Sequence, residues 1–441
     1  MNPNWAQATV ADLEARGALL VEDGNHGENR PRPDEFTGDG VQFIRAADMD
    51  SGRVLFESAQ RINEVALRRV RKGIGAGGDV LLSHKGTVGK VAYVPLNSPP
   101  FVCSPQTTFW RVKDADQLDQ RYLYYFLQSR AFHEQLNSRK GETDMADYVS
   151  LTNQRRLTVT VPPITEQKGV AAMLGALDDK IELNRRMNAT LEAMARALFQ
   201  SWFVDFDPVR AKLDGRQRAD HDSATAALFP NEFQDSELGP IPKGWEVVPL
   251  PEAIEVNPRR KLEPRTFAPY LDMKNMPTQG HCPDEVIQRE FRSGTKFQNG
   301  DTLLARITPC LENGKTAFVD FLNDGEIGWG STEYIVFSPR PPLPPQLGYL
   351  LARSDSLRAH AIQNMTGTSG RQRAPAECLG SYLIAVPPSE LAIRFGEVSS
   401  PLFARVKTNS RESRTLARMR DTLLPKLLSG ELRMRLGGLH A

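Results

Sequence analysis

The sequence predicts a mixed α+β protein in which two duplicated domains are separated by two long antiparallel helices. Three observations support this fold class: a long amphipathic stretch from Thr165 to Asp207, strand-like runs on both sides of it, and an internal repeat at a shift of 225 positions. A repeat of this length indicates that one structural unit has been used twice. We therefore expect a pseudo-twofold relation between the halves and a coiled-coil-like spacer between them.

The stretch beginning at Thr165 has the pattern of a helix that needs a partner. Its apolar or small residues recur every three or four positions, which places them on one stripe, and charged residues fill the other faces. Asn184 and Asn188 interrupt the stripe. At 1.5 Å rise per residue the helix is roughly 58 Å long, too long to bury its stripe within one small domain.

The chain divides into five predicted parts. Residues 1–164 are a first domain with strand-like runs at 80–82, 91–94, 107–110 and 158–161, and one helix over 119–136. Residues 165–205 form the long helix with Thr165 as N-cap, and residues 206–240 are a linker with room for one short helix. Residues 241–388 form a second domain with a helix over 346–363, and residues 389–441 are again helical in pattern.

Composition limits the class of protein. Of 441 residues, 40% are hydrophobic and 25% charged, as in ordinary globular proteins. No apolar run is long enough for a membrane span and the N-terminus has no secretion pattern. The four cysteines form no CxxC pair, so we expect neither a disulfide nor a metal site. This cysteine usage also predicts a cytoplasmic location. A net charge of +1 excludes a bulk polycation but not a DNA-binding face.

The internal repeat supplies the partner helix. The run from Gly89 to Val94 matches the run from Gly314 to Val319, and Tyr124 falls on Tyr349 in the same register. The stripe repeats as well, which predicts that the two long helices pair along a seam. The predicted seam residues are Leu174, Leu177, Ile181, Asn184, Leu191 and Leu198 in the first helix, and Leu402, Val406, Asn409, Leu416 and Leu423 in the second.

Two details of the seam remain open. Asn184 and Asn409 occupy equivalent positions, where a buried Asn fixes register at some cost in stability; alternatively, both lie at the edge of the stripe in water. Pro401 is unfavourable inside a helix, so we expect it in the first turn of a helix that follows a shorter one.

No group of residues in the sequence has the pattern of a catalytic site. Glu166 and Lys168 have a spacing found in nucleases, but they open a helix, where such residues favour capping. The glycine-containing runs that end at Lys90 and Lys315 lack the first glycine of a phosphate-binding loop. A turn before a strand is the better interpretation of both runs. We expect no catalysis and no bound cofactor from this chain alone.

Basic and polar residues recur in loops of both predicted domains. Arg and Lys neutralise phosphates, and Arg also reads base edges, although any single one can equally be a solvated surface residue. The candidate DNA-binding residues are Arg45, Ser83, His84, Lys85, Lys90, Arg139, Lys140, Arg259, Arg260, Arg292, Lys296, Arg306, Lys315, Arg371 and Arg373.

Several motifs resemble one family. Residues 199–212 (FQSWFVDFDPVRAK) and 229–233 (FPNEF) resemble the central conserved region of the specificity subunits of Type I restriction–modification systems. Residues 241–245 (IPKGW) and the ending 416–432 (LARMRDTLLPKLLSGEL) are similar to further conserved parts of that family.

The resemblance implies a non-catalytic subunit with two target-recognition domains on paired helices. Each domain would read one half of a split double-stranded DNA target, and the helices would set the spacing of the halves. Two modification subunits would methylate adenine with S-adenosylmethionine, and restriction subunits would use ATP and magnesium to translocate and cut DNA. The alternatives are a methyltransferase or nuclease accessory domain that works alone, and a helical scaffold without DNA binding.

Overall fold

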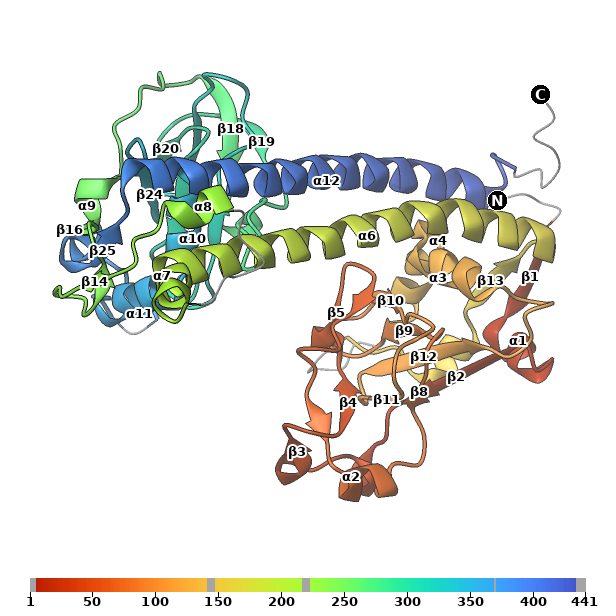
Figure 1. Ribbon diagram of the computed structural model, residues 1–441. Coiled ribbons are helices and arrows are strands. Elements are labelled where there is room, and N and C mark those ends of the chain that lie inside the picture. The colour runs from red at the N-terminus through yellow and green to blue at the C-terminus, as the bar shows by residue number, and fades with distance from the viewer. Residues whose placement is uncertain (1–4, 141–146, 216–222, 369, 434–441) are drawn as a thin grey trace. The chain divides into compact units, whose positions relative to one another are not determined.

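The computed structural model describes residues 5–140, 147–215, 223–368 and 370–433 (Figure 1). The chain forms two compact units, Met1–Lys180 with Thr415–Ala441, and Ile181–Arg414. Each unit holds one α/β domain and the adjoining parts of two long helices, α6 (Ile164–Phe203) and α12 (Ser389–Ser429). The expected fold class is confirmed; the exact domain boundaries stay a prediction.

The domain of the first unit is built on two sheets. The larger has the order β2-β12-β9-β10-β6-β5 and the smaller β3-β7-β4-β11-β8, while β1 pairs with β13. The strands of the larger sheet are β2 (Leu19–Asp23), β12 (Thr107–Val112), β9 (Val80–Ser83), β10 (Val91–Tyr93), β6 (Arg53–Val54) and β5 (Met49–Asp50). The others are β3 (Phe36–Thr37), β7 (Arg61–Ile62), β4 (Val41–Ile44), β11 (Phe101–Cys103), β8 (Ile74–Gly75), β1 (Ala6–Thr9) and β13 (Thr158–Val161).

The domain of the second unit repeats this topology. Its sheets have the orders β17-β24-β21-β22 and β19-β18-β23-β20, and β16 pairs with β25 as β1 does with β13. In each domain the second sheet contains one parallel pair, β4 with β11 and β18 with β23. These strands are β17 (Ile254–Val256), β24 (Tyr334–Pro339), β21 (Thr302–Ala305), β22 (Thr316–Phe318), β19 (Ile287–Glu290), β18 (Phe267–Leu271), β23 (Gly328–Gly330), β20 (Thr295–Phe297), β16 (Glu246–Pro249) and β25 (Leu383–Val386).

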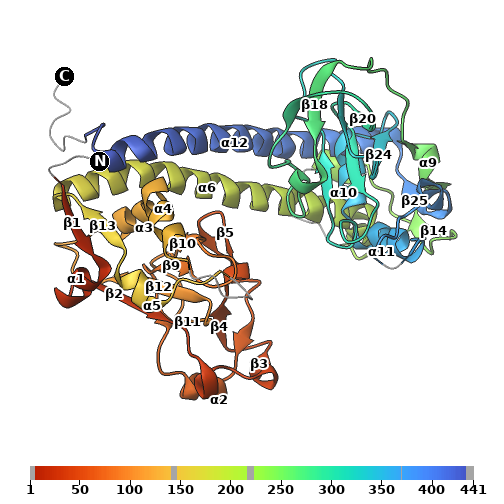
Figure 2. The same cartoon turned by 180° about the vertical axis from the view of Figure 1, so that it is seen from behind.

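Short helices complete each domain. In the first they are α1 (Val10–Ala15), α2 (Glu64–Arg69), α3 (Gln120–Gln128), α4 (Arg130–Ser138), α5 (Leu151–Arg155) and the 3-10 turns η1 (Gly27–Asn29), η2 (Pro33–Glu35) and η3 (Ala46–Asp48). In the second they are α9 (Leu250–Ala253), α10 (Pro345–Ala352), α11 (Asp355–Gln363), η4 (Met273–Asn275) and η5 (Ala376–Ser381). In both views α3 and α4 lie between the large sheet and α6 (Figures 1 and 2), where Leu123 and Leu174 share one apolar core.

The prediction of one helix over residues 119–136 and one over residues 346–363 is wrong. The structure has two helices in each of these stretches. Ser129 has extended backbone (ψ 148°), and its hydroxyl accepts a hydrogen bond from the amide of Phe132, which starts α4. Ser354, at the equivalent position, does the same for Leu357 and starts α11. A serine N-cap inside an apolar periodic stretch thus breaks the helix without interrupting the period.

Two expectations about the long helices are also wrong. α6 begins at Ile164, because the carbonyl of Pro163 accepts the amides of Glu166 and Gln167, so Thr165 lies inside the first turn. α12 runs without a break through Pro401. The proline removes one hydrogen-bond donor, and the buried rings of Phe395 and Phe403 hold the helix against the core on either side of it.

The linker contains more regular structure than one short helix. It holds α7 (Asp207–Leu213), α8 (Ser223–Ala227), and the strand pair β14 (Phe233–Gln234) and β15 (Ile241–Pro242). Trp202, Phe229 and Trp245 are buried together in the core of the second unit. The FQSWFVDFD and FPNEF stretches thus cap the end of α6 with an aromatic core.

Within each unit the parts of α6 and α12 that it holds run antiparallel and lie side by side (Figures 1 and 2). In the second unit Asn184 donates to Glu412 and Ser413, whereas Asn188, one turn later, donates to Ser410. In the first unit Arg420 forms an ion pair with Asp178. Among the predicted seam residues Leu174, Asn184, Val406 and Asn409 are buried, and Leu177, Ile181, Leu191, Leu198, Leu402, Leu416 and Leu423 are half-buried. Within the described ranges, no helix is both long and apolar enough to cross a membrane.

Candidate nucleic-acid interface

In the first domain, the loop between β9 and β10 pairs with a second loop far along the chain. Lys85 forms an isolated antiparallel bridge with Tyr148. The amide of Val149 donates to the carbonyl of His84 (2.9 Å), and the amide of Gly86 donates to that of Asp147 (3.0 Å). The ammonium of Lys85 lies 5.8 Å from the centre of the Tyr148 ring. These contacts hold an exposed lysine at the end of the central strand β9.

The second domain has the same pair of loops. Ile307, two residues after the end of β21, bridges Arg373, and the amide of Ala374 donates to the carbonyl of Arg306 (2.8 Å). Arg373 stands 225 positions after Tyr148, so the bridge is repeated with the rest of the domain. We call these loops, residues 83–90 with 147–149 and 305–315 with 366–374, the paired loops.

The glycines that open β10 and β22 are structural. Gly89 and Gly314 both have positive φ, at 102° and 71°, which glycine adopts without the steric clash of a Cβ. The lysines that follow them are structural as well. The ammonium of Lys90 donates to the carbonyls of Ala46 and Met49, and that of Lys315 to those of Met273 and Lys274.

Two candidate residues have no access to solvent. Ser83 and His84 are both 0% exposed. The Ser83 hydroxyl accepts the amide of Lys90 (2.8 Å), and His84 Nδ1 lies 3.1 Å from the carbonyl oxygen of Val149. Burial lowers the pKa of His84 to about 4, so its ring is neutral at pH 7. Neither side chain can reach DNA without a rearrangement.

Several candidate cations are held by carboxylates. Arg45 pairs with Asp48, Lys140 with Asp147, and Arg260 with the buried Asp301. Arg306 and Arg373 share Glu333, and Arg373, the larger contributor, holds the pKa of that carboxyl below its usual range. Lys296 lies 5.0 Å from the centre of the Phe291 ring. Arg139 is half-buried at the end of α4, and its carbonyl accepts a hydrogen bond from Asn153.

Five candidate cations are exposed: Lys85, Arg259, Arg292, Arg371 and Arg373. Lys85 and Arg371 lie on the paired loops, where Arg373 is also 44% exposed at its side chain. The paired loops therefore present cations to solvent in both domains, Lys85 on the β9–β10 loop of the first and Arg371 on residues 366–374 of the second. Sequence reasoning missed Tyr148 and Glu333, which position these cations. The internal repeat of the sequence already aligns Tyr148 with Arg373. The backbone bridges from Lys85 to Tyr148 and from Ile307 to Arg373 are seen only in the structure.

Comparisons with known proteins agree with this architecture. Residues 26–193 match the family described as Type I restriction modification DNA specificity domain. The chain is 23% identical to the Type I restriction enzyme MjaIX specificity subunit of Methanocaldococcus jannaschii, over 91% of this chain and 88% of that protein. It is also 23% identical to the HindI specificity subunit of Haemophilus influenzae, over 89% of this chain and 94% of that protein.

A solved structure has the same fold. The S subunit of a Type I restriction–modification system from M. genitalium superposes with a TM-score of 0.54 at 15% identity, covering 97% of this chain and 96% of that one. The chain is thus similar along nearly its whole length to specificity subunits of Type I restriction–modification systems, and it shares their fold.

Proposed function

We propose that this chain is the non-catalytic DNA-recognition subunit of a Type I restriction–modification complex and that it reads a bipartite target. Each domain binds one half of the target through its paired loops. The helix pair sets the number of unread base pairs between the halves. In this proposal the complex works in the cytoplasm, where the DNA is.

The observation that carries the proposal is the repetition of the paired loops. An exposed cation lies on them in each domain, Lys85 in the first and Arg371 in the second. Exposed cations gain affinity by neutralising phosphates, whereas those already paired with carboxylates contribute less. Repeated paired loops that carry an exposed cation in each of two domains fit two half-sites better than one continuous site.

The antiparallel helix pair supports the spacing role. Contacts between α6 and α12 keep one register, from Asn188 with Ser410 to Asn184 with Ser413 in the second unit, and again at Asp178 with Arg420 in the first. The outer faces of both helices are rich in exposed charge, as at Arg185, Arg186 and Arg418. We propose that modification subunits bind these faces and supply S-adenosylmethionine-dependent adenine methylation, and that restriction subunits supply ATP- and magnesium-dependent cleavage.

The test is to express the chain with its modification subunit in cells that lack other methylation, and to map methylated adenines across the genome. We expect one split target with a fixed spacer, and no methylation without this chain. A continuous target would contradict the two-domain proposal. The purified chain alone, with DNA, magnesium and S-adenosylmethionine, should neither methylate nor cut, and activity there would contradict the non-catalytic role.

A further inference from the structure

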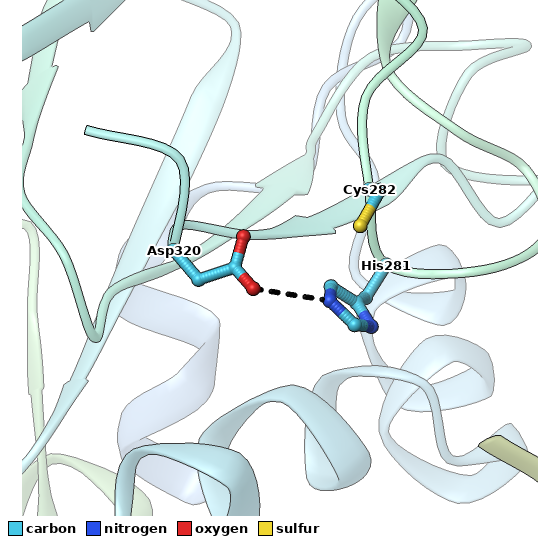
Figure 3. A group of neighbouring side chains, drawn as sticks. All are labelled: His281, Cys282 and Asp320. Carbon is cyan, nitrogen blue, oxygen red and sulfur yellow. Dashed lines mark hydrogen bonds and ion pairs between the residues drawn. The ribbon is translucent and has the colours of Figure 1, made fainter. Parts of the chain in front are cut away.

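A group of metal-ligating side chains lies in the second unit, away from the paired loops. His281 and Cys282 come from the loop between η4 and β19, and Asp320 follows β22. One ligand atom from each, a ring nitrogen, a thiol sulfur and a carboxylate oxygen, lies within 4.8 Å of the others. The three side chains point toward one another (Figure 3). We propose that these residues bind one zinc ion.

The distance between the nitrogen and oxygen ligand atoms fits a tetrahedral ion. His281 Nε2 lies 3.3 Å from Asp320 Oδ2. Two nitrogen or oxygen ligands at zinc bond lengths and a tetrahedral angle are about 3.3 Å apart, and a sulfur lies slightly farther from either. An ion pair between imidazolium and carboxylate is normally shorter, about 2.7–2.9 Å. The ligand set of imidazole, thiolate and carboxylate is also one that zinc accepts.

Glu192 of α6 orients the histidine for this role. Its Oε1 accepts the ring Nδ1–H of His281 at 3.0 Å and the backbone amide of His281 at 2.7 Å. A carboxylate on one ring nitrogen fixes the tautomer that leaves the other nitrogen free for a metal. The opposite Glu192 oxygen, Oε2, is 3.4 Å from the hydroxyl of Tyr349. The Glu192 carboxylate thus binds one nitrogen of the His281 ring, and the other ring nitrogen faces the proposed metal position.

The surroundings hold the ligands in place before any ion binds. The His281 ring stacks on Phe403 (4.9 Å between centroids, 27° between planes). The guanidinium of Arg353 donates to the carbonyls of Pro277, Thr278, Gly280, Gly314 and Thr316, which ties the ligand loop to the strand β22. The carbonyl of His281 accepts the amide of Phe318 (3.1 Å). Ligands positioned in this way lose little conformational freedom on binding.

Charge and access are also suitable. A zinc ion with one thiolate and one carboxylate is neutral overall, and the Glu192 carboxylate beside His281 lies 3.7 Å from the guanidinium of Arg196. His281 is 0% exposed, whereas Cys282 and Asp320 are partly exposed, which leaves a route for the ion and a fourth position for water. Pro95 stands at the position of Asp320 in the first domain, so the site belongs to the second domain alone. Zinc would pin the loop at residues 277–284 to β22 and, through Glu192, to α6.

The experiment uses the full chain, stripped with a chelator, dialysed, and titrated with zinc or cobalt. We expect one ion per chain by elemental mass spectrometry, and with cobalt a thiolate charge-transfer band in the near ultraviolet. Cys282→Ser should remove the band, whereas Cys310→Ser, in the same unit, should retain it. Glu192→Gln should keep the band but weaken zinc affinity about 10–100-fold.

Two results would overturn the site: a chain that retains no stoichiometric zinc, or a cobalt band that persists in Cys282→Ser. If the Cys282→Ser variant does not fold, the site can still be tested on the wild-type chain by alkylation of its cysteines. Zinc should slow alkylation of Cys282 by iodoacetamide, followed by peptide mass spectrometry, while alkylation of Cys378 continues unchanged. Equal alkylation of Cys282 with and without zinc would contradict the proposal.

Discussion

Asn184 and Asn409, which stand at equivalent positions 225 residues apart, meet in the seam between α6 and α12. The carboxamide nitrogen of Asn184 lies 3.4 Å from the carbonyl oxygen of Asn409, to which it donates. Asn409 in turn donates to Asn188 Oδ1 (2.9 Å), and Asn184 donates to Ser413 Oγ (3.3 Å). Since Ser413 is the repeat equivalent of Asn188, these two bonds are related by the pseudo-twofold axis. Both asparagines are buried, which decides against the alternative that they lie in water.

The first prediction concerns this polar group. Replacing Asn409 with Ala removes the part-buried hydrogen bond that Asn409 donates to Asn188 Oδ1. We expect the free energy of unfolding to fall by about 1–3 kcal/mol, measured by urea denaturation. Thr408→Ala, at an exposed neighbouring position, is the control and should change it by less than about 0.5 kcal/mol. Equal effects of the two substitutions would contradict a role for Asn409 in the seam.

The second prediction concerns spacing. Residues 184–190 lie opposite residues 407–413, so duplicating both blocks adds two helical turns and keeps the seam in phase. The added length is about 10.5 Å, or about 3 base pairs at 3.4 Å each. Methylome sequencing should give the same half-sites with a spacer about 3 base pairs longer. An unchanged spacer would show that the helices do not set the distance.

The third prediction concerns the paired loops. Lys85→Ala should weaken or relax recognition of one half-site only, and Arg371→Ala the other, because each exposed cation lies on its own domain. Loss of one phosphate contact should reduce the salt dependence of binding by about one unit of slope. Gel-shift assays with the modification subunit present, at several salt concentrations, measure both effects. Arg130→Ala is the control, because the side chain of Arg130 on α4 is 92% exposed. A change in both half-sites from either variant would contradict independent domains.

The fourth prediction concerns pH. Hydrogen bonds from Arg69 and from the backbone amide of Arg32 lower the pKa of Glu35 from 4.5 to about 2. A depressed carboxyl pKa stabilises the fold fully above 4.5, and this stabilisation is lost as pH falls toward 2. The stability difference between wild type and Glu35→Gln should therefore shrink below pH 4.5. Glu64→Gln, which removes an exposed partner of Arg68, is the control variant.

The fifth prediction concerns Arg353, whose guanidinium binds five backbone carbonyls. Arg353→Met removes the guanidinium hydrogen bonds to these carbonyls, and we expect the free energy of unfolding to fall by about 2–4 kcal/mol. Arg340→Met is the matched control, because Arg340 is half exposed and its ion pair with Glu255 is long at 3.9 Å. If both variants were equally stable, the guanidinium would not hold the loop.

Much of the fold could be predicted because its signals are local or repeated. The α6 stripe follows from helical periodicity over residues 164–203, and the second helix follows from the repeat. The helix breaks at Ser129 and Ser354 could not be placed, since a serine N-cap leaves the apolar period intact. The path of α12 through Pro401 could not be predicted either, because it depends on packing of Phe395 and Phe403 against residues far away in the chain.

The sequence by itself determined the duplication, the two long helices and their antiparallel pairing, because periodicity and repetition are properties of the chain alone. Only the tertiary structure decided which cations face solvent. In the sequence Lys90 and Lys315 cannot be told apart from Lys85 and Arg371 as candidate DNA-binding cations. In the structure the ammonium groups of Lys90 and Lys315 donate to backbone carbonyls, whereas Lys85 and Arg371 are exposed. Folding likewise brings Asp320 and Glu192 to His281. The physical reason is that exposure and pairing depend on partners tens to hundreds of residues away.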